Sequence, residues 1–251
     1  MSKFINYSYT SSSGWSRSYG NSQARKQSEY SKETKYFDAA MLKAPLNRVN
    51  LNRVTGAWDT SEIDPATINT LFLPVLGVDR SNRIGRQVWV THIEIRGSIY
   101  VDPINLSLPA PSFPDSSIAR LILFVDKQTN GVRAKAEDVV YMNTTLDGNH
   151  IADLYNVRYF DRFEILVDET FVLEDANFIQ REGASQLNYN GKSLTFHWNV
   201  EFLEPLIINF NNKQNGNISD IVDNSIHMIG SYQGQAYPVN CRYRSRVSFI
   251  E

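Results

Sequence analysis

The sequence contains a single cysteine, Cys241, among its 251 residues. One thiol cannot build an intrachain disulfide framework or a cysteine-based zinc cluster, and unpaired cysteine is typical of a reducing compartment. Free cysteine is also among the residue types most often buried, so we expect Cys241 to be a small buried side chain in a C-terminal strand.

Long apolar runs are missing as well. No stretch approaches the roughly 18 residues that a membrane-spanning helix needs. The first residues, MSKFINYSYTSSSGW, lack the apolar segment that characterises a signal peptide. We therefore expect no membrane insertion and no secretion signal.

Recognisable catalytic motifs are absent too: the sequence has no Walker loop, dinucleotide fingerprint or G-x-S-x-G. A calcium site using Asp126, Asp161 or Asp168 is conceivable from their oxygen ligands, but no EF-hand-like spacing supports it. No histidine has another His or Cys at metal-ligand spacing. The four histidines are His92, His150, His197 and His227. We predict a protein that is not an enzyme, with no catalytic residue, metal or cofactor.

What the sequence does contain is an uneven distribution of charge. Residues 1–53 carry nine Lys/Arg and three Asp/Glu, a net charge of +6, whereas the rest of the chain carries 16 bases and 24 acids. This segment is rich in Ser, Tyr and Asn and cannot bury enough apolar surface to offset its ordering entropy. We predict a flexible basic N-terminal arm over residues 1–55 and a folded shell domain over residues 56–251. The arm is either a nucleic-acid-binding segment or a solvated tail without a partner.

The longest amphipathic pattern is RIGRQVWVTHIEIRGSIYV, from Arg83 to Val101. From Trp89 onward the odd-numbered positions are mostly apolar, which is the period of a strand with one buried face. The even-numbered positions carry His92, Glu94 and Arg96. Because the strand is about twice the usual length, we expect a bend or bulge, with Gly97 as the candidate position.

Further strands are predicted along the rest of the chain, separated by long loops, with a single short helix at residues 134–142. The predicted strands cover residues 68–75, 118–125, 150–155, 162–172, 192–202, 205–210, 225–230 and 239–250. About eight strands with almost no helix indicate an all-β fold, a β-sandwich or jelly roll.

The last predicted strand, NCRYRSRVSFIE, places Arg242, Arg244 and Arg246 on one face. Three arginines along one strand repel each other unless acids or phosphates neutralise them. Two interpretations are open. The arginines form a basic stripe or a subunit contact, or they pair with acids on a neighbouring strand, such as Glu94.

In their order, these pieces resemble the capsid proteins of small circular single-stranded DNA viruses that encode a replication initiator, whose shells are related to geminivirus coat proteins. The resemblance rests on the basic arm followed by RIGRQVWVTHIEIRGSI, ARLILFVDKQTNG and YFDRFEILVDETFVL, and covers about residues 70–250. It implies an eight-stranded antiparallel jelly roll of two four-stranded sheets. In it, the strand from Arg83 to Val101 would be the first and would pair with the last.

The resemblance also implies the partners. These are further copies of the chain, about 60 in a T=1 icosahedral shell, and single-stranded nucleic acid, expected to be DNA. The protein would reside in the virion and in the host cell, where a nuclear stage is compatible with a basic arm. The arm departs from the family pattern because its longest basic run is only Arg25-Lys26.

On this interpretation the nucleic acid is bound by the arm and the last strand. The candidate residues are Arg17, Arg25, Lys26, Lys32, Lys35, Lys43, Arg48, Arg53, Arg242, Arg244 and Arg246. Two other classes are open. One is a β-sandwich module that binds glycans through Trp and Tyr. The other is a jelly-roll enzyme of the cupin kind, which needs clustered His and Glu ligands.

Overall fold

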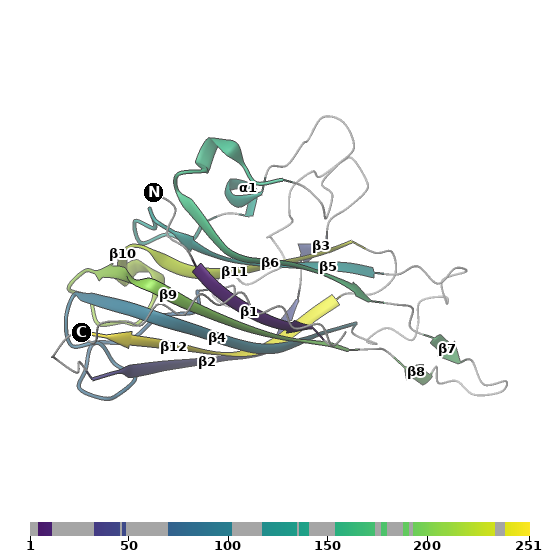
Figure 1. Cartoon of the computed structure of the whole chain (residues 1–251), viewed down its shortest axis with the longest axis horizontal. Coiled ribbons are helices and arrows are strands. Elements are labelled where there is room, and N and C mark those ends of the chain that lie inside the picture. The colour runs from purple at the N-terminus through teal and green to yellow at the C-terminus, as the bar shows by residue number, and fades with distance from the viewer. Residues whose placement is uncertain are drawn as a thin grey trace.

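The computed structural model describes residues 5–11, 33–45, 47–48, 70–101, 117–134, 136–140, 154–173, 177–179, 188–190, 193–233 and 239–251. Almost all of its regular structure is strand, apart from the short helix α1 (Ala136–Val139) and two single 3-10 turns (Figure 1). The strands are β1 (Ile5–Ser11), β2 (Lys35–Pro45), β3 (Asn47–Arg48), β4 (Gln87–Val101), β5 (Ser117–Asp126), β6 (Phe163–Leu173), β7 (Asn177–Ile179), β8 (Asn188–Asn190), β9 (Leu194–Phe210), β10 (Ile221–Asp223), β11 (Ser225–Gln233) and β12 (Val239–Ile250).

Two sheets lie face to face as a sandwich (Figure 1). The first, the β4 sheet, has the order β1-β9-β4-β12-β2, with β10 added to β9; the second, the β5 sheet, has the order β3-β11-β5-β6. All pairs are antiparallel except the two-residue contact of β3 with β11. Strands β7 and β8 form a separate hairpin.

The pairing defines a jelly roll. Without the added strands β1 and β10 and the β7–β8 hairpin, eight strands remain in the two sheets. In chain order, the first pairs with the eighth (β2 with β12), the second with the seventh (β3 with β11), the third with the sixth (β4 with β9) and the fourth with the fifth (β5 with β6). A long hairpin rolled up on itself gives this order, which confirms the predicted eight-stranded jelly roll. The two-residue contact of β3 with β11 departs from the antiparallel pattern because it is parallel.

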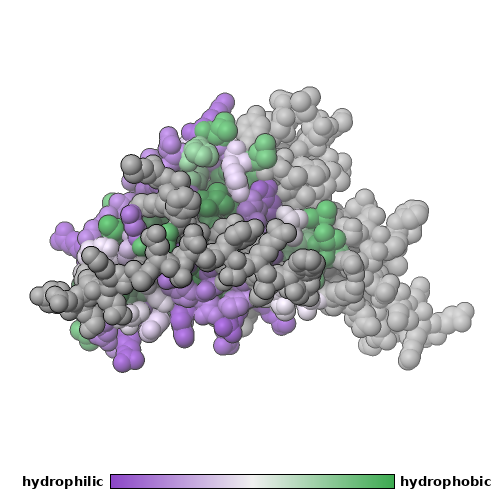
Figure 2. All heavy atoms as spheres, viewed as in Figure 1, coloured by the Kyte–Doolittle hydropathy of each residue, from purple (hydrophilic) through white to green (hydrophobic). Residues whose placement is uncertain are grey.

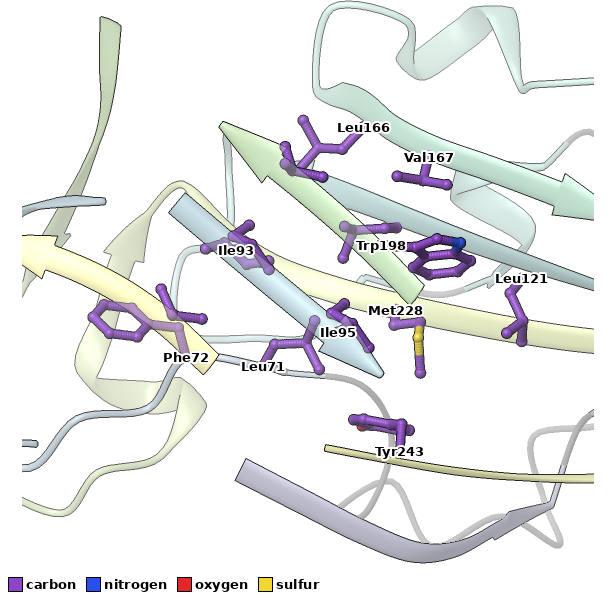
Figure 3. Close-up of a cluster of buried hydrophobic side chains, with 14 of the residues drawn as sticks. Leu71, Phe72, Ile93, Ile95, Leu121, Leu166, Val167, Trp198, Met228 and Tyr243 are labelled. Atoms are coloured by element: carbon purple, nitrogen blue, oxygen red, sulfur yellow. The ribbon is translucent and has the colours of Figure 1, made fainter. Parts of the chain in front are cut away.

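The main core fills the space between the two sheets (Figure 3). It is built from the inward-facing residues of both, including Ile93 and Ile95 on β4, Trp198 on β9 and Leu121 on β5, each at most 1% exposed. Apolar burial of this extent is the main stabilising contribution in a chain without disulfides.

A second, smaller core lies on the other side of the β5 sheet. There the segment between β5 and β6, which carries α1, folds back over the sheet and buries Ile122 and Phe124 against Val139, Val140 and Phe163. Strand β5 is therefore covered on both faces, which explains why its sequence, IARLILFV, is apolar at every position but Arg120.

Strand β4 lies where the sequence predicts it, but its core face changes along its length. Val88 and Val90 are buried at one end, and Ile93 and Ile95 are buried further along. The register with β9 shifts between these pairs, because Val90 faces Leu206 while His92 faces Glu201. The prediction that Trp89 and Thr91 face the core is therefore wrong, and the bulge is here rather than at Gly97.

Glycine is required at position 97 for close packing and not for a bulge. A Cβ at this position would lie only 2.7 Å from the carbonyl oxygen of Arg242 and would overlap the ring of Phe196. The glycine allows β12 and the Phe196 ring to approach the β4 backbone closely.

The position of β4 in the fold also differs from the expectation. It does pair with the last strand, β12, as predicted, but it is the third strand of the jelly roll and not the first. Its two neighbours are β9 and β12, so it lies in the interior of its sheet.

The first strand of the jelly roll is β2, which lies within the segment predicted as a flexible arm. Its residues pair with β12 from Lys35, opposite Phe249, to Pro45, opposite Asn240. A flexible arm is therefore wrong for residues 35–45, and β1 pairs with β9 as well. The predicted boundary between residues 55 and 56 lies outside the described residues.

Two smaller expectations are also corrected. Residues 70–75 form no strand and contribute only a single bridge, from Thr70 to His227. The strands predicted at 192–202 and 205–210 are one strand, β9. It continues through Pro205 because this residue lies in the bulge opposite Val90 and His92, where the ladder requires no N–H.

Candidate nucleic-acid interface

The outer face of the β4 sheet carries the polar side chains of its central strands in register. On β12 the side chains alternate, so that Arg242, Arg244 and Arg246 are exposed while Cys241, Tyr243 and Ser245 are buried. Arg246 lies opposite Glu94 on β4, Arg244 opposite Arg96, and Arg242 opposite Ser98. The predicted neighbourhood of β12 arginines, Glu94 and Arg96 is therefore present. We call Arg96, Arg242, Arg244 and Arg246 the arginine cluster.

Arg246 is paired with an acid of the neighbouring strand. Its Nε and Nη2 donate to the two carboxylate oxygens of Asp38 on β2, at 2.7 and 2.6 Å. This bidentate contact lowers the pKa of Asp38 below its ordinary value and raises that of Arg246. One of the three predicted arginines is thus neutralised, by Asp38 rather than by Glu94.

Glu94 instead serves Arg96 and a histidine. Its Oε1 accepts from Arg96 Nη2 at 2.6 Å and lies 3.0 Å from His197 Nε2. The hydrogen bond from Arg96 is the main reason why the pKa of Glu94 is lowered. Next to this group, the ring of His92 on β4 is hydrogen-bonded to Asn199.

Arg242 and Arg244 have no acidic partner among the described residues. Arg242 donates from Nε to Ser98 Oγ at 2.8 Å, and its guanidinium lies 5.6 Å from the centre of the Tyr100 ring. Arg244 lies opposite Ala40 of β2 on one side and opposite Arg96 of β4 on the other. An exposed guanidinium presents several donors in a plane, which suits bidentate contacts with phosphate.

Lys35 does not belong to this interface. The residue is only 6% exposed. Its Nζ donates to Glu251 Oε2 at 3.0 Å and to the backbone oxygen of Asn82 at 3.1 Å. Its prediction as a nucleic-acid contact is wrong, because it faces inward and joins β2 to the C-terminus.

The other predicted contacts are not placed by the structure. Lys43 and Arg48 lie on β2 and β3, but their side chains are outside the described part of the chain. The remaining predicted residues, Arg17, Arg25, Lys26, Lys32 and Arg53, lie outside it altogether. Arg96 is not among the predicted contacts. Its position on the polar face of the strand expected to pair with the last strand was the sequence feature that indicated it.

The carboxylates considered for calcium are mostly held by arginines. Asp126, fully buried, accepts a bidentate contact from Arg162 at 2.8 and 2.7 Å, and Asp168 accepts one from Arg120 at 2.8 and 2.7 Å. Within the described ranges, no group of three or more His, Cys, Asp or Glu residues is placed to hold a metal ion. No helix found there is both long and apolar enough to cross a membrane.

Comparisons with known proteins add little. No family model and no curated protein matches the chain. Among solved structures, the chain is similar to a subunit of the VP1 pentamer of Human Polyomavirus 6, with 10% identity and a TM-score of 0.27, over 89% of this chain and 96% of that one. The jelly-roll assignment rests on the strand pairing described above.

Proposed function

We propose that this chain is the coat protein of a small virus. It is a structural protein without enzymatic activity, and it assembles with copies of itself into an icosahedral shell that encloses a single-stranded DNA genome. The single observation that carries the proposal is the arginine cluster on the outer face of one sheet of a jelly roll. On this proposal, that face is turned toward the genome in the virion.

The charges on this face support a phosphate-binding role. Of the four arginines in the cluster, two have acidic partners, whereas Arg242 and Arg244 have none in the part of the chain that the structure describes. One subunit with two uncompensated cations binds phosphate weakly. A shell of about 60 copies multiplies the same small surplus into a large positive surface. The predicted arm contacts other than Lys35 add further cations, so a modest charge per chain suffices.

The kind of virus is inferred from the sequence. The order of RIGRQVWVTHIEIRGSI, ARLILFVDKQTNG and YFDRFEILVDETFVL resembles capsid proteins of small circular DNA viruses, which leads us to propose DNA as the genome and a T=1 arrangement. Jelly rolls also occur in lectins and cupins, so the fold by itself does not select among these functions.

Electron microscopy of the purified recombinant chain tests the proposal. We expect closed particles of uniform size that contain nucleic acid, seen as an elevated absorbance ratio at 260 to 280 nm. A protein that stays monomeric across salt and pH would contradict the shell, and a monomer that binds sugars on an array would favour the glycan-binding alternative.

The contribution of the arm needs a truncation that leaves the jelly roll intact. Because β2 begins at Lys35, the deletion should remove residues 1–32. We expect the truncated chain to stay folded, with a lower melting temperature because β1 no longer pairs with β9, and to co-purify with less nucleic acid than the full chain. Unchanged nucleic-acid content in the truncated form would contradict the role of the arm.

A further inference from the structure

The exposed apolar side chains gather at one end of the sandwich. Ten of the 13 exposed large hydrophobic residues in the described chain lie in the loop before β4, in the segment between β5 and β6, or at the strand ends beside them. They are Val75, Val78, Ile84, Val132, Leu154, Val157, Tyr159, Phe160, Ile207 and Val222. Exposed apolar side chains grouped in one region of a molecule are typical of interaction sites.

One part of this surface is concave. A hollow of about 820 Å³ lies between residues 155–165 and the part of β9 from Pro205 to Ile207. Phe160, at 72% exposed, lines it together with Ile207, at 40%. Figure 2 shows apolar residues over the upper part of the molecule, on the side where α1 lies in Figure 1. We call this hollow the Phe160 groove.

Another part of the same end projects. The loop from Val75 to Arg86 carries Val78, 88% exposed, and Ile84, 61% exposed. Backbone hydrogen bonds from Gly77 to Arg83 and from Arg83 to Val75, both 2.9 Å, hold the loop in shape. We call this loop the Val78 knob.

Buried Arg83 anchors the knob further. Its guanidinium donates to the backbone oxygens of Gly85 at 2.8 Å and Lys213 at 2.6 Å, and lies 4.5 Å from the centre of the Phe210 ring. The knob is thus a pre-formed projection, which lowers the entropy cost of inserting it into a partner.

The charges beside the two features are complementary. The groove is lined by Lys127, Asp161 and Glu164, and because Lys127 pairs with Glu164 at 3.5 Å, Asp161 leaves a net negative charge. The knob carries Asp79, Arg80 and Arg86, which leave a net positive charge. Within the described residues, Arg80 has one ionic contact, a 4.0 Å approach to Glu33 in which both side chains are highly exposed.

The knob and the groove lie on different sides of the same end. The knob is hydrogen-bonded to β2, at an edge of the β4 sheet, through Tyr36 N and Arg80 O. The groove is lined by residues 205–207 of β9 and by the segment between β5 and β6. In the sheet, β9 is separated from β2 by β4 and β12 (Figure 1). Two complementary surfaces that point in different directions cannot meet within one chain. They meet when copies are arranged head to tail around a rotation axis.

From these features we infer that the Val78 knob of one copy inserts into the Phe160 groove of the next, and that this head-to-tail contact joins neighbouring subunits. The inference rests on the proposed self-assembly and specifies the surfaces that carry it out. Val78 and Ile84 supply the apolar contact, and Arg80 and Asp161 set its orientation.

Two single substitutions test the contact in the full-length chain. Val78→Asp and Phe160→Asp should each abolish or reduce assembly at least tenfold, measured as the particle fraction by light scattering and electron microscopy. Both residues are largely exposed, so thermal unfolding should stay within a few degrees of the unmodified chain. The matched control is Val172→Asp, an exposed apolar residue on β6, 54% exposed and outside this end, which should assemble normally.

Disulfide trapping then tests the head-to-tail geometry. A mixture of Val78→Cys and Phe160→Cys chains, oxidised under native conditions, should give covalent dimers that contain one chain of each variant. Either variant alone should give several-fold fewer covalent dimers, because the knob of one copy does not contact the knob of the next. The buried Cys241 does not react under these conditions.

The outcomes separate this inference from the proposed function. If the unmodified chain forms no particles, the proposed self-assembly fails. If it forms particles, and the two aspartate variants do so equally well without any mixed covalent dimer, the shell stands and the knob-and-groove contact is overturned.

Discussion

Arg244 on β12 lies directly opposite Arg96 on β4, in the centre of the β4 sheet. Like charges in directly opposed positions of an antiparallel pair are destabilising. Glu94 compensates Arg96, whereas Arg244 has no acid beside it among the described residues. Such an arrangement is costly in the free subunit and becomes favourable when an anion binds, which is the reason to expect a functional role for Arg244.

The first prediction follows from this pair. Arg244→Gln should weaken binding of single-stranded DNA and leave the free energy of unfolding unchanged or slightly higher, because it removes both a phosphate contact and a repulsion. Measured by fluorescence anisotropy at several salt concentrations, the slope of log K against log salt should fall by about 0.7, the value for one phosphate contact on a single strand.

Arg246→Gln is the matched control on the same face of the same strand. Arg246 already donates two hydrogen bonds to Asp38, so its loss should change DNA affinity less than the loss of Arg244. An equal loss of affinity in the two variants would contradict a special role for the uncompensated arginine.

The second prediction concerns Asp168 and Arg120, which join β6 to β5 outside the main core. Arg120 is 8% exposed and donates two hydrogen bonds to Asp168. Asp168→Asn keeps an acceptor but removes the charge opposite a buried guanidinium, so we expect a loss of about 1–3 kcal/mol in the free energy of unfolding, measured by urea denaturation. Tyr155→Phe, which removes only a neutral donor to the same carboxylate, should cost less.

This pair also predicts a pH dependence. Burial alone would raise the pKa of Asp168, but hydrogen bonds from Arg120 and Tyr155 outweigh burial and lower it below 3.8. The stabilisation is therefore fully present above the pKa of an ordinary aspartate and is lost as the pH falls through the lowered value in the folded state. The difference in stability between the unmodified chain and Asp168→Asn should shrink on acidification below about pH 4; a constant difference would contradict the ion pair.

The sequence predicted much of this fold because its strands obey a simple alternation. Phe196, Trp198, Val200 and Phe202 are all buried as their spacing predicts, and β12 has the predicted bounds. The alternation fails at Trp89 because β4 has one extra residue, Thr91, opposite the consecutive β12 residues Ser248 and Phe249. This bulge depends on the pairing of β4 with β12 and β9, which are remote in sequence.

The predicted basic arm and the arginine cluster show a second limit of prediction from the sequence. Lys35 was grouped with the basic arm by composition, but the strand that contains it pairs with β12, more than 200 residues away. Its partner Glu251 is the last residue of the chain. By contrast, Arg242, Arg244 and Arg246 were found correctly as one exposed face, because that property depends only on strand periodicity. The arginine that is neutralised is the one beside Asp38 of β2. This pairing could be identified only from the structure.

The third prediction concerns Glu169 on β6 and Trp198 on β9. The indole Nε1 of Trp198, a residue 1% exposed, donates to Glu169 Oε2 at 2.7 Å. Burial raises the pKa of Glu169, against the smaller opposing effect of this hydrogen bond. The ionised carboxylate therefore costs stability at neutral pH, and that cost disappears as the pH falls through the raised pKa of the folded state.

Two substitutions separate the charge from the hydrogen bond. Glu169→Gln keeps an acceptor for the indole and removes the charge, so it should raise the melting temperature at pH 7 and have a smaller effect near pH 4. Glu169→Leu leaves the indole N–H without a partner and should cost about 1–3 kcal/mol. Equal effects of the two substitutions in differential scanning calorimetry would show that the hydrogen bond does not matter.

The last prediction concerns Cys241, the only thiol, which is fully buried on the inner face of β12. Burial raises its pKa to about 12, and the reactive species toward disulfide reagents is the thiolate. In the folded protein at pH 8 we expect reaction with Ellman's reagent to be slower than that of an exposed thiol by at least a hundredfold, and one thiol per chain to react at once in denaturant. The Val78→Cys variant is the matched control, because its added thiol replaces a side chain that is 88% exposed and should react rapidly in the folded state. Rapid reaction of Cys241 in the unmodified chain would mean that β12 opens readily, and would contradict its place in the centre of the β4 sheet.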